Sequence, residues 1–176
     1  MTATEQFIDV LKTLKAGDRK LLRTHAGLGL DQSVQGFDLF AGIWWPLRQN
    51  SPKAPRREVA WLVAKMFASY PIPHFLDETL ASQLKKRQPT QTQDSNRFAQ
   101  RFDRMLVLPL NKIESALQWA LKCIAELKYP KLDWVRLTYD LSIWERDATR
   151  LKWANQFLQL TKGDSDVNRD SHDSKP

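Results

Sequence analysis

Apolar residues recur three and four positions apart along most of this chain, and that spacing limits its fold more than any other feature. Residues 56–70 place Val59, Leu62 and Met66 on one stripe, and residues 113–127 carry a second stripe of the same kind. A period near 3.6 residues is typical of amphipathic helices, whereas half-buried strands alternate every second residue. Alternating β-branched residues are almost absent, and the chain has only six glycines. We therefore expect an all-α fold.

Helix-start signals and turn residues divide the chain into eight or nine expected helices. Thr2 opens a capping box before the first apolar residues, and Asn111 resembles the first residue of a second one. Asp77 and Asp133 stand where they can cap two further helices. The expected helices cover residues 2–14, 17–23, 37–47, 56–70, 78–87, 95–108, 111–128, 133–144 and 147–160.

A polar stretch near the middle of the chain separates two helical halves. Residues 88–94 are rich in glutamine and threonine and are typical of a linker. We expect an N-terminal lobe over residues 1–90 and a C-terminal lobe over residues 91–162, each packed as a small helical bundle. Residues 163–176 are rich in aspartate and serine, which predicts a disordered acidic tail.

Basic residues outnumber acidic ones, 27 to 20, and the excess lies outside the acidic tail. Over residues 1–162 there are 25 basic and 16 acidic side chains. A charge excess of this size favours a polyanionic partner, although it carries no information on the fold.

The cysteine content and the absence of long apolar runs favour a cytoplasmic location. A single cysteine, Cys123, excludes a disulfide within the chain, which fits a reducing cytoplasm. The first residues lack the basic and apolar regions of a signal peptide. No apolar run approaches the roughly 18 residues that a membrane span needs. We expect a cytoplasmic protein with no membrane partner.

Residues that could carry catalysis are few and scattered. His25, His74 and His172 stand in three different contexts, and none is spaced as a metal ligand from another histidine or from Cys123. There is neither a glycine-rich phosphate loop nor a Gly-x-Ser-x-Gly turn. Cys123 lies among apolar residues of an expected helix, which favours a buried thiol. We expect no enzyme activity, no metal and no cofactor, because a nuclease would need a carboxylate cluster that the pattern lacks.

The strongest candidate for a binding surface is a row of arginines on the expected helix 95–108. Arg97, Arg101 and Arg104 stand at i, i+4 and i+7 and therefore share one face. Like charges at this spacing destabilise a helix by about 0.2–0.5 kcal/mol per pair. No acidic residue stands where it could compensate Arg101 or Arg104. A phosphate backbone would relieve the repulsion; a solvated basic face is the simpler alternative.

Further basic groups complete the candidate nucleic-acid surface. Arg56 and Arg57 open an expected helix, where cations oppose the helix dipole while free N–H groups attract phosphate. Arg136 is excluded because Asp140, four residues on, can pair with it. The full set of candidate residues is Arg19, Arg23, Lys53, Arg56, Arg57, Arg97, Arg101, Arg104, Arg146 and Arg150.

Seven tryptophans are many for a chain of this length, and most should be buried. Trp134 and Trp144 align with other apolar residues and are expected in the core. Trp44 and Trp45 are adjacent on a helix, so they point about 100° apart and cannot share one face. One of them could lie exposed against a partner protein or a base, but burial between neighbouring helices is the simpler expectation.

Four segments together resemble a known family. Arg97–Leu106 resembles the arginine-rich helix of CasB, the small subunit of type I-E CRISPR Cascade effector complexes, and Leu132–Leu141 is similar to its Asp-Trp helix. Arg150–Phe157 resembles its closing helix, and Gly17–Arg23 its Gly-Asp-x-x-x-Leu-Arg element. The resemblance covers about residues 15–158, with the middle weakest.

The resemblance implies a non-catalytic, two-lobed helical subunit. In that family two copies lie beside the backbone and large subunits of a complex that contains the guide RNA. Their basic residues hold the displaced non-target DNA strand and stabilise the R-loop. By position, the family's binding residues correspond to Arg23, Arg56 or Arg57, Arg101, Arg104 and Arg150. The alternative that the residues leave open is a helical scaffold whose basic surface meets an acidic protein.

Overall fold

The chain folds into helices joined by short loops. The computed structural model describes residues 1–159, and within that range it contains nine α-helices, two 3₁₀ turns and no strand. The all-α prediction is confirmed. The helices are α1 (Ala3–Lys12), α2 (Ala16–Thr24), α3 (Val34–Asn50), α4 (Arg57–Ser69), α5 (Leu80–Arg87), α6 (Thr92–Leu106), α7 (Glu114–Ala125), α8 (Trp134–Ser142) and α9 (Asp147–Leu158), with 3₁₀ turns η1 (Leu30–Gln32) and η2 (Leu110–Lys112).

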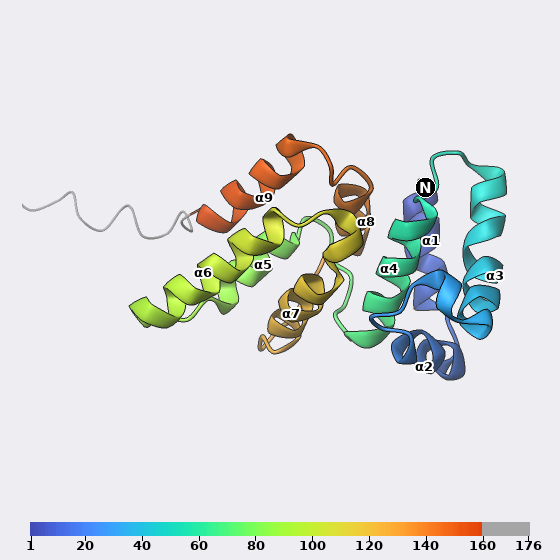
Figure 1. The fold of residues 1–176 in the computed structure, drawn as a ribbon, viewed down its shortest axis with the longest axis horizontal. Helices are drawn as coiled ribbons and strands as arrows, with labels where there is room; N and C mark the ends of the chain where they lie inside the picture. Colours follow the sequence, from blue (N-terminus) through green and yellow to red (C-terminus); the bar gives the residue numbers. More distant parts are fainter. Residues whose placement is uncertain (160–176) are drawn as a thin grey trace, which may run out of the picture.

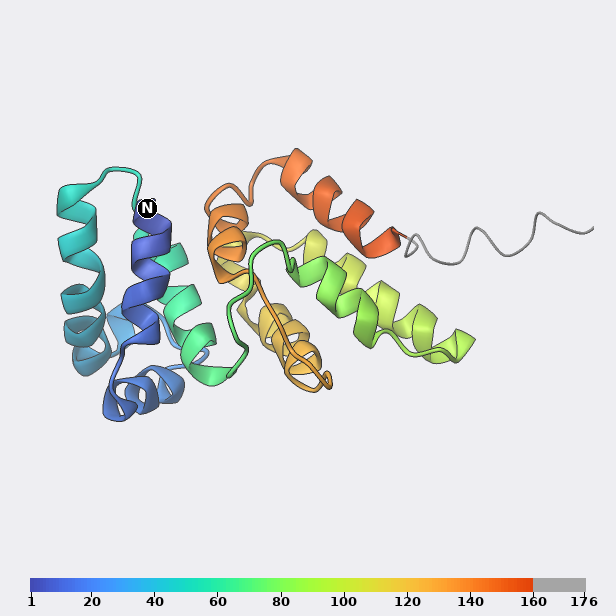
Figure 2. The same ribbon diagram turned by 180° about the vertical axis from the view of Figure 1, so that it is seen from behind.

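The helices form two lobes side by side (Figure 1). Helices α1 to α4 make one lobe, with α3 at its outer edge, and α5 to α9 make the other, with α6 reaching its far tip. The expected boundary near residue 90 would assign α5 to the first lobe, but α5 packs on α7 and α9 of the second. The packing therefore changes from one lobe to the other along residues 70–79, which cross between the lobes in Figure 2.

The two lobes share a continuous core. Helix α8 packs against both α1 and α4, so the C-terminal lobe contacts the N-terminal one along two helices. Trp134 is fully buried at this junction, where its ring meets Phe67 edge-on with centroids 5.0 Å apart. Its indole N–H donates to the carbonyl of Ile72 at 2.9 Å. The expected burial of Trp134 and Trp144 is confirmed.

Helix starts follow the sequence signals in some places and not in others. The capping box of Thr2 is present, and Asp133 accepts a hydrogen bond from the Arg136 N–H at 2.9 Å. The prediction for Asp77 is wrong: Thr79 caps α5, and Asp77 has a φ of 63° in the loop before it. The prediction of a second capping box at Asn111 is also wrong, because α7 begins at Glu114 and its N-cap residue, Ile113, provides no side-chain cap. The predicted acidic tail lies outside the described residues.

Candidate nucleic-acid interface

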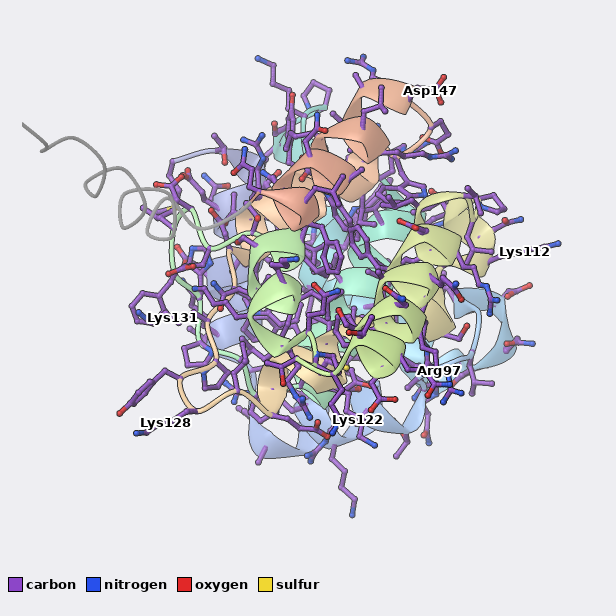
Figure 3. All side chains as sticks on the ribbon, turned by 90° about the vertical axis from the view of Figure 1, so that its left-hand side faces the viewer. Arg97, Lys112, Lys122, Lys128, Lys131 and Asp147 are labelled. Atoms are coloured by element: carbon purple, nitrogen blue, oxygen red, sulfur yellow. The ribbon has the colours of Figure 1, made fainter. Side chains whose placement is uncertain are left out.

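The arginine row of α6 is exposed along the length of the helix. Arg97, Arg101 and Arg104 are all exposed, while Phe102 and Met105 on the opposite side are fully buried. Within residues 1–159 none of the three arginines forms an ion pair. Figure 3 shows Arg97 on the outside of the C-terminal lobe, on the same side as Lys112. The helix therefore presents three charges that the described carboxylates leave unneutralised.

Arg101 is held in place by an aromatic ring rather than by an acid. Its guanidinium lies 4.7 Å from the ring centroid of Trp119 on α7. Trp119 is half-buried and in turn packs against Phe98, with centroids 5.1 Å apart. A cation–π contact at an exposed site contributes about 0.5–1 kcal/mol and leaves the positive charge available to a ligand. Arg101 is therefore oriented without being neutralised.

A second group of arginines lines a cleft between the lobes, with a volume of about 750 Å³. Arg56 and Arg57 reach it from the start of α4, and Arg150 reaches it from α9. Arg150 Nε donates to the Trp144 carbonyl at 3.1 Å, and its guanidinium lies 5.5 Å from the Trp144 ring centroid. Arg150 is thus positioned in the same manner as Arg101.

The arginines from α4 are partly neutralised, which the sequence did not indicate for Arg56. Arg56 bridges the lobes by pairing with Glu145 at 3.2 Å, and Arg57 lies 3.8 Å from Glu58. A hydrogen bond from its own backbone, followed by the contact with Arg56, holds the pKa of Glu145 below its usual value. Both ion pairs are exposed, and exposed pairs contribute only about 0–1 kcal/mol, so a phosphate can compete for these arginines.

The floor of the cleft contains a buried ion pair. Lys65 is 1% exposed, and its Nζ lies 2.8 Å from Glu114 Oε2 and 2.8 Å from the carbonyl of Leu28. Burial lowers the pKa of Lys65, while the bond to Glu114 opposes that shift. Glu114 Oε1 also accepts from the N–H of Gly27 at 2.7 Å. These contacts fix α7 against α4 and the loop after α2.

Arg19 and Arg23 line a separate hollow of about 760 Å³ between α2 and the end of α4. Arg19 donates to the carbonyl of Lys12 at 2.6 Å, which directs its guanidinium across the gap between α1 and α2. Lys12 also lines the hollow, and no carboxylate does. This basic hollow is therefore suited to contact with a polyanion.

The remaining predicted residues lie apart from these groups. Lys53 lines a hollow with Met1, Glu5 and Arg136 rather than the inter-lobe cleft that Arg56 and Arg57 line. Arg146 is exposed at the start of α9. Eight of the ten predicted residues therefore form three groups: the α6 row, the arginines of the inter-lobe cleft, and the basic hollow.

Several side chains outside the candidate surface match their predictions only in part. Arg136 pairs with Asp140 at 3.3 Å, which confirms its exclusion. Cys123 is half-buried rather than fully buried, and burial raises the pKa of its thiol. Trp45 is 52% exposed, so the simpler expectation of burial is wrong for this residue. Trp44 is half-buried and donates to the Pro55 carbonyl at 2.8 Å.

Neither a metal centre nor a membrane-spanning helix has a candidate among the residues that the structure describes. Among residues 1–159, no group of three or more histidine, cysteine, aspartate or glutamate side chains is placed to hold a metal ion. In the same range no helix is long and apolar enough to cross a membrane.

The fold and its basic surfaces define an all-α, two-lobed protein with exposed arginine groups on several elements. The family of CRISPR-associated protein Cse2 matches residues 19–158, and the chain belongs to that family. Its fold is similar to CasB from M. ruber, with a TM-score of 0.71 and 20% identity over 89% of this chain and 93% of that chain. CasB from Thermus thermophilus has a TM-score of 0.68 and 23% identity over 89% of this chain and 98% of that chain. No curated protein sequence matches the chain. The resemblance to the CasB family is thus confirmed.

Proposed function

We propose that this chain is a non-catalytic subunit of a Cascade complex that holds the displaced non-target DNA strand and so stabilises the R-loop in antiviral defence. The observation that carries the proposal is the α6 row, where Arg97, Arg101 and Arg104 are exposed without an ion pair in the described residues. Membership of the Cse2 family supports the placement in a CRISPR complex. Its proposed partners are the guide-RNA-containing assembly, the backbone and large subunits, and a second copy of the chain.

The geometry favours backbone contact over reading of bases. Arg101 and Arg150 are each held against a tryptophan ring. Their guanidinium groups therefore have fixed positions, and neither is paired with an acidic side chain in the described residues. Such charges attract the sugar-phosphate backbone of any sequence, and the binding should weaken steeply with salt. Three separate groups of arginine also suit a flexible single strand better than a straight duplex.

The test replaces Arg101 and Arg104 with alanine and measures binding of single-stranded DNA over a range of salt concentrations. Exposed charge pairs contribute about 0.2–1 kcal/mol each, so affinity should fall roughly tenfold for the double variant at low salt. The slope of log affinity against log salt should decrease by about 0.7 for each lost phosphate contact. The loss should be similar for unrelated DNA sequences.

The matched control removes two arginines that already have partners. Arg87 pairs with Glu126 at 3.3 Å, and Arg136 pairs with Asp140. Arg87→Ala with Arg136→Ala changes the net charge by the same amount as the α6 double variant. Equal losses from the two double variants would show that only net charge matters, and the α6 surface would be the wrong assignment. Metal-dependent cleavage of DNA by the parent protein would overturn the non-catalytic role.

A protein scaffold is the second candidate, and exposed apolar side chains on α3 favour it. Trp45 is 52% exposed and Val34 is 78% exposed at the outer edge of the N-terminal lobe. Under this function an acidic partner protein would cover the basic surfaces. Salt-sensitive DNA binding by the free chain would then be absent at physiological ionic strength.

A further inference from the structure

The inter-lobe cleft differs in chemistry from the other basic surfaces. It lies between the start of α4 and the loop after α2 on one side, and η2 and the start of α9 on the other. Four cationic and four acidic side chains line it: Arg56, Arg57, Lys65 and Arg150, with Asp31, Glu58, Glu114 and Glu145. The basic hollow at α2, in contrast, has no acid in its lining. Equal numbers of cationic and acidic side chains do not favour a ligand that is only a phosphate. The cleft is better suited to a ligand that carries both an anionic group and hydrogen-bond donors.

The same cleft has an apolar wall that the fold leaves uncovered. Phe37 is 46% exposed and Leu28 is 39% exposed, and both line the cleft. Trp61 behind them is 5% exposed and is fixed by its indole N–H, which donates to the Leu28 carbonyl at 3.0 Å. Leu110 faces the cleft from the other lobe. An exposed phenylalanine beside arginines is the combination on which unpaired bases stack.

Polar groups are also present for the edge of a base. Asp31 lines the cleft from the N-terminal lobe and Asn111 lines it from the C-terminal lobe. Neither side chain forms a hydrogen bond within the described residues. A carboxylate accepts from the exocyclic amino group of a base, and an amide can both donate and accept. Arg150 remains without an acidic partner in the described range and can contact phosphate.

We infer that the inter-lobe cleft takes one unpaired nucleotide of the held strand, with its base against Phe37 and its phosphates on Arg150 and Arg56. This inference rests on the proposed function and adds a stacking site to a surface that otherwise contacts only the backbone. The bound phosphate competes with Glu145 for Arg56. The volume of about 750 Å³ leaves room for one nucleotide together with solvent.

The test compares two oligomers of equal length and charge, oligothymidylate and an abasic deoxyribose-phosphate chain. Each is titrated against the full-length parent and against Phe37→Ala and Phe37→Leu. Stacking of a single base is worth roughly tenfold in affinity, so the parent should prefer oligothymidylate. In both Phe37 variants the preference for oligothymidylate should shrink about tenfold, because neither alanine nor leucine has an aromatic ring. Leucine keeps most of the apolar volume, so its result separates stacking from simple apolar contact. The affinity for the abasic chain should be unchanged.

Phe75 supplies the matched control, since it is also 46% exposed but does not line the cleft. Phe75→Ala should keep the full preference of the parent for oligothymidylate. Arg150→Ala should weaken both oligomers by the same factor. If Phe37→Ala retains the parent's preference while both oligomers bind with strong salt dependence, the nucleotide site is refuted and the proposed function stands. If neither oligomer binds the parent, both the site and the proposed function fail.

Discussion

Lys65 and Glu114 show how a lysine can be buried between two lobes. The ammonium group has the Glu114 carboxylate and the Leu28 carbonyl as partners, so its charge is compensated inside the protein. Glu114 is 24% exposed at its side chain, and it also accepts from the Gly27 N–H. Removal of one partner from a buried pair is costly, because the other charge stays in a poorly solvated place.

Glu114→Ala is expected to lower the free energy of unfolding by about 2–4 kcal/mol, since it leaves Lys65 and the Gly27 N–H without this acceptor. The measurement is urea-induced unfolding followed by far-UV circular dichroism. Glu126→Ala serves as the control, because Glu126 forms an exposed pair with Arg87 and should cost at most about 1 kcal/mol. A loss for Glu114→Ala no larger than the control would show that the buried pair contributes nothing measurable.

Sequence spacing predicts side-chain pairs within one helix but not pairs between elements that are far apart in the sequence. Arg136 and Asp140 are one helical turn apart, and their ion pair follows from helix geometry. Lys65 and Glu114 are separated by 49 positions, so only the tertiary fold brings them together. The same holds for Arg56 and Glu145, and for the ring of Trp119 under Arg101 on a neighbouring helix. The arginines of the candidate site can be named from the sequence, but the groups that orient or neutralise them could not be predicted from it.

At the scale of elements, Asp140 joins α8 to α9. It is 2% exposed and accepts from Lys152 Nζ at 2.9 Å and from the indole N–H of Trp153 at 2.8 Å, both on α9. Arg136 on its own helix is a third partner. One carboxylate therefore fixes how α9, which carries Arg150, lies on the lobe.

Asp140→Ala is expected to destabilise the fold by about 3–5 kcal/mol, because it leaves the charge of Lys152 and the buried indole N–H of Trp153 without their acceptor. Asp140→Asn should cost less, since an amide oxygen can still accept from Trp153. Thermal unfolding by calorimetry gives both values. Asp103, an exposed residue of α6, provides the control, and its change to alanine should stay within about 0.5 kcal/mol. A loss for Asp140→Ala as small as that of the control would contradict the assigned role.

Helix starts were predictable where a side chain could act locally. Asp133 caps α8 as its position before an apolar run indicates, and it also accepts from the Asp77 N–H at 3.0 Å. That second bond belongs to a loop in which Asp77 adopts a positive φ, so Asp77 supports the turn instead of capping α5. Glu114 fits the spacing of a capping box, but its carboxylate is engaged with Lys65. In both cases a tertiary contact outweighed the local signal.

For the whole molecule, composition near the centre of the chain gave a misleading indication of where the lobes part. Residues 88–94 are polar, yet Gln88 donates to the hydroxyl of Ser95 at 2.8 Å, and the chain turns there within one lobe. The segment that crosses between the lobes, residues 70–79, contains Ile72, which is 4% exposed. The carbonyl of Ile72 accepts a hydrogen bond from the indole N–H of Trp134. A crossing segment that takes part in the core does not look like a linker in the sequence.

The shared core leads to a prediction for the unfolding of the whole chain. Leu11 in α1 and Leu121 in α7 are fully buried in different lobes, and both belong to one cluster of apolar contacts. Each change to alanine should cost about 2–5 kcal/mol, and the cost should apply to both lobes because they unfold together. Hydrogen exchange followed by peptide mass spectrometry separates the lobes directly.

Leu11→Ala should accelerate the slowest hydrogen exchange of α7 and α8 as much as that of α4. Leu121→Ala should likewise accelerate exchange in α4 of the N-terminal lobe as much as in α7 and α8. Acceleration limited to the mutated lobe would mean that the lobes unfold independently and that the contacts of α8 with α1 and α4 do not couple them. Coupling matters for binding, because the inter-lobe cleft keeps its shape only while both lobes hold their places. The cleft arginines come from α4 and α9, so a strand bound across them should raise the stability of both lobes together.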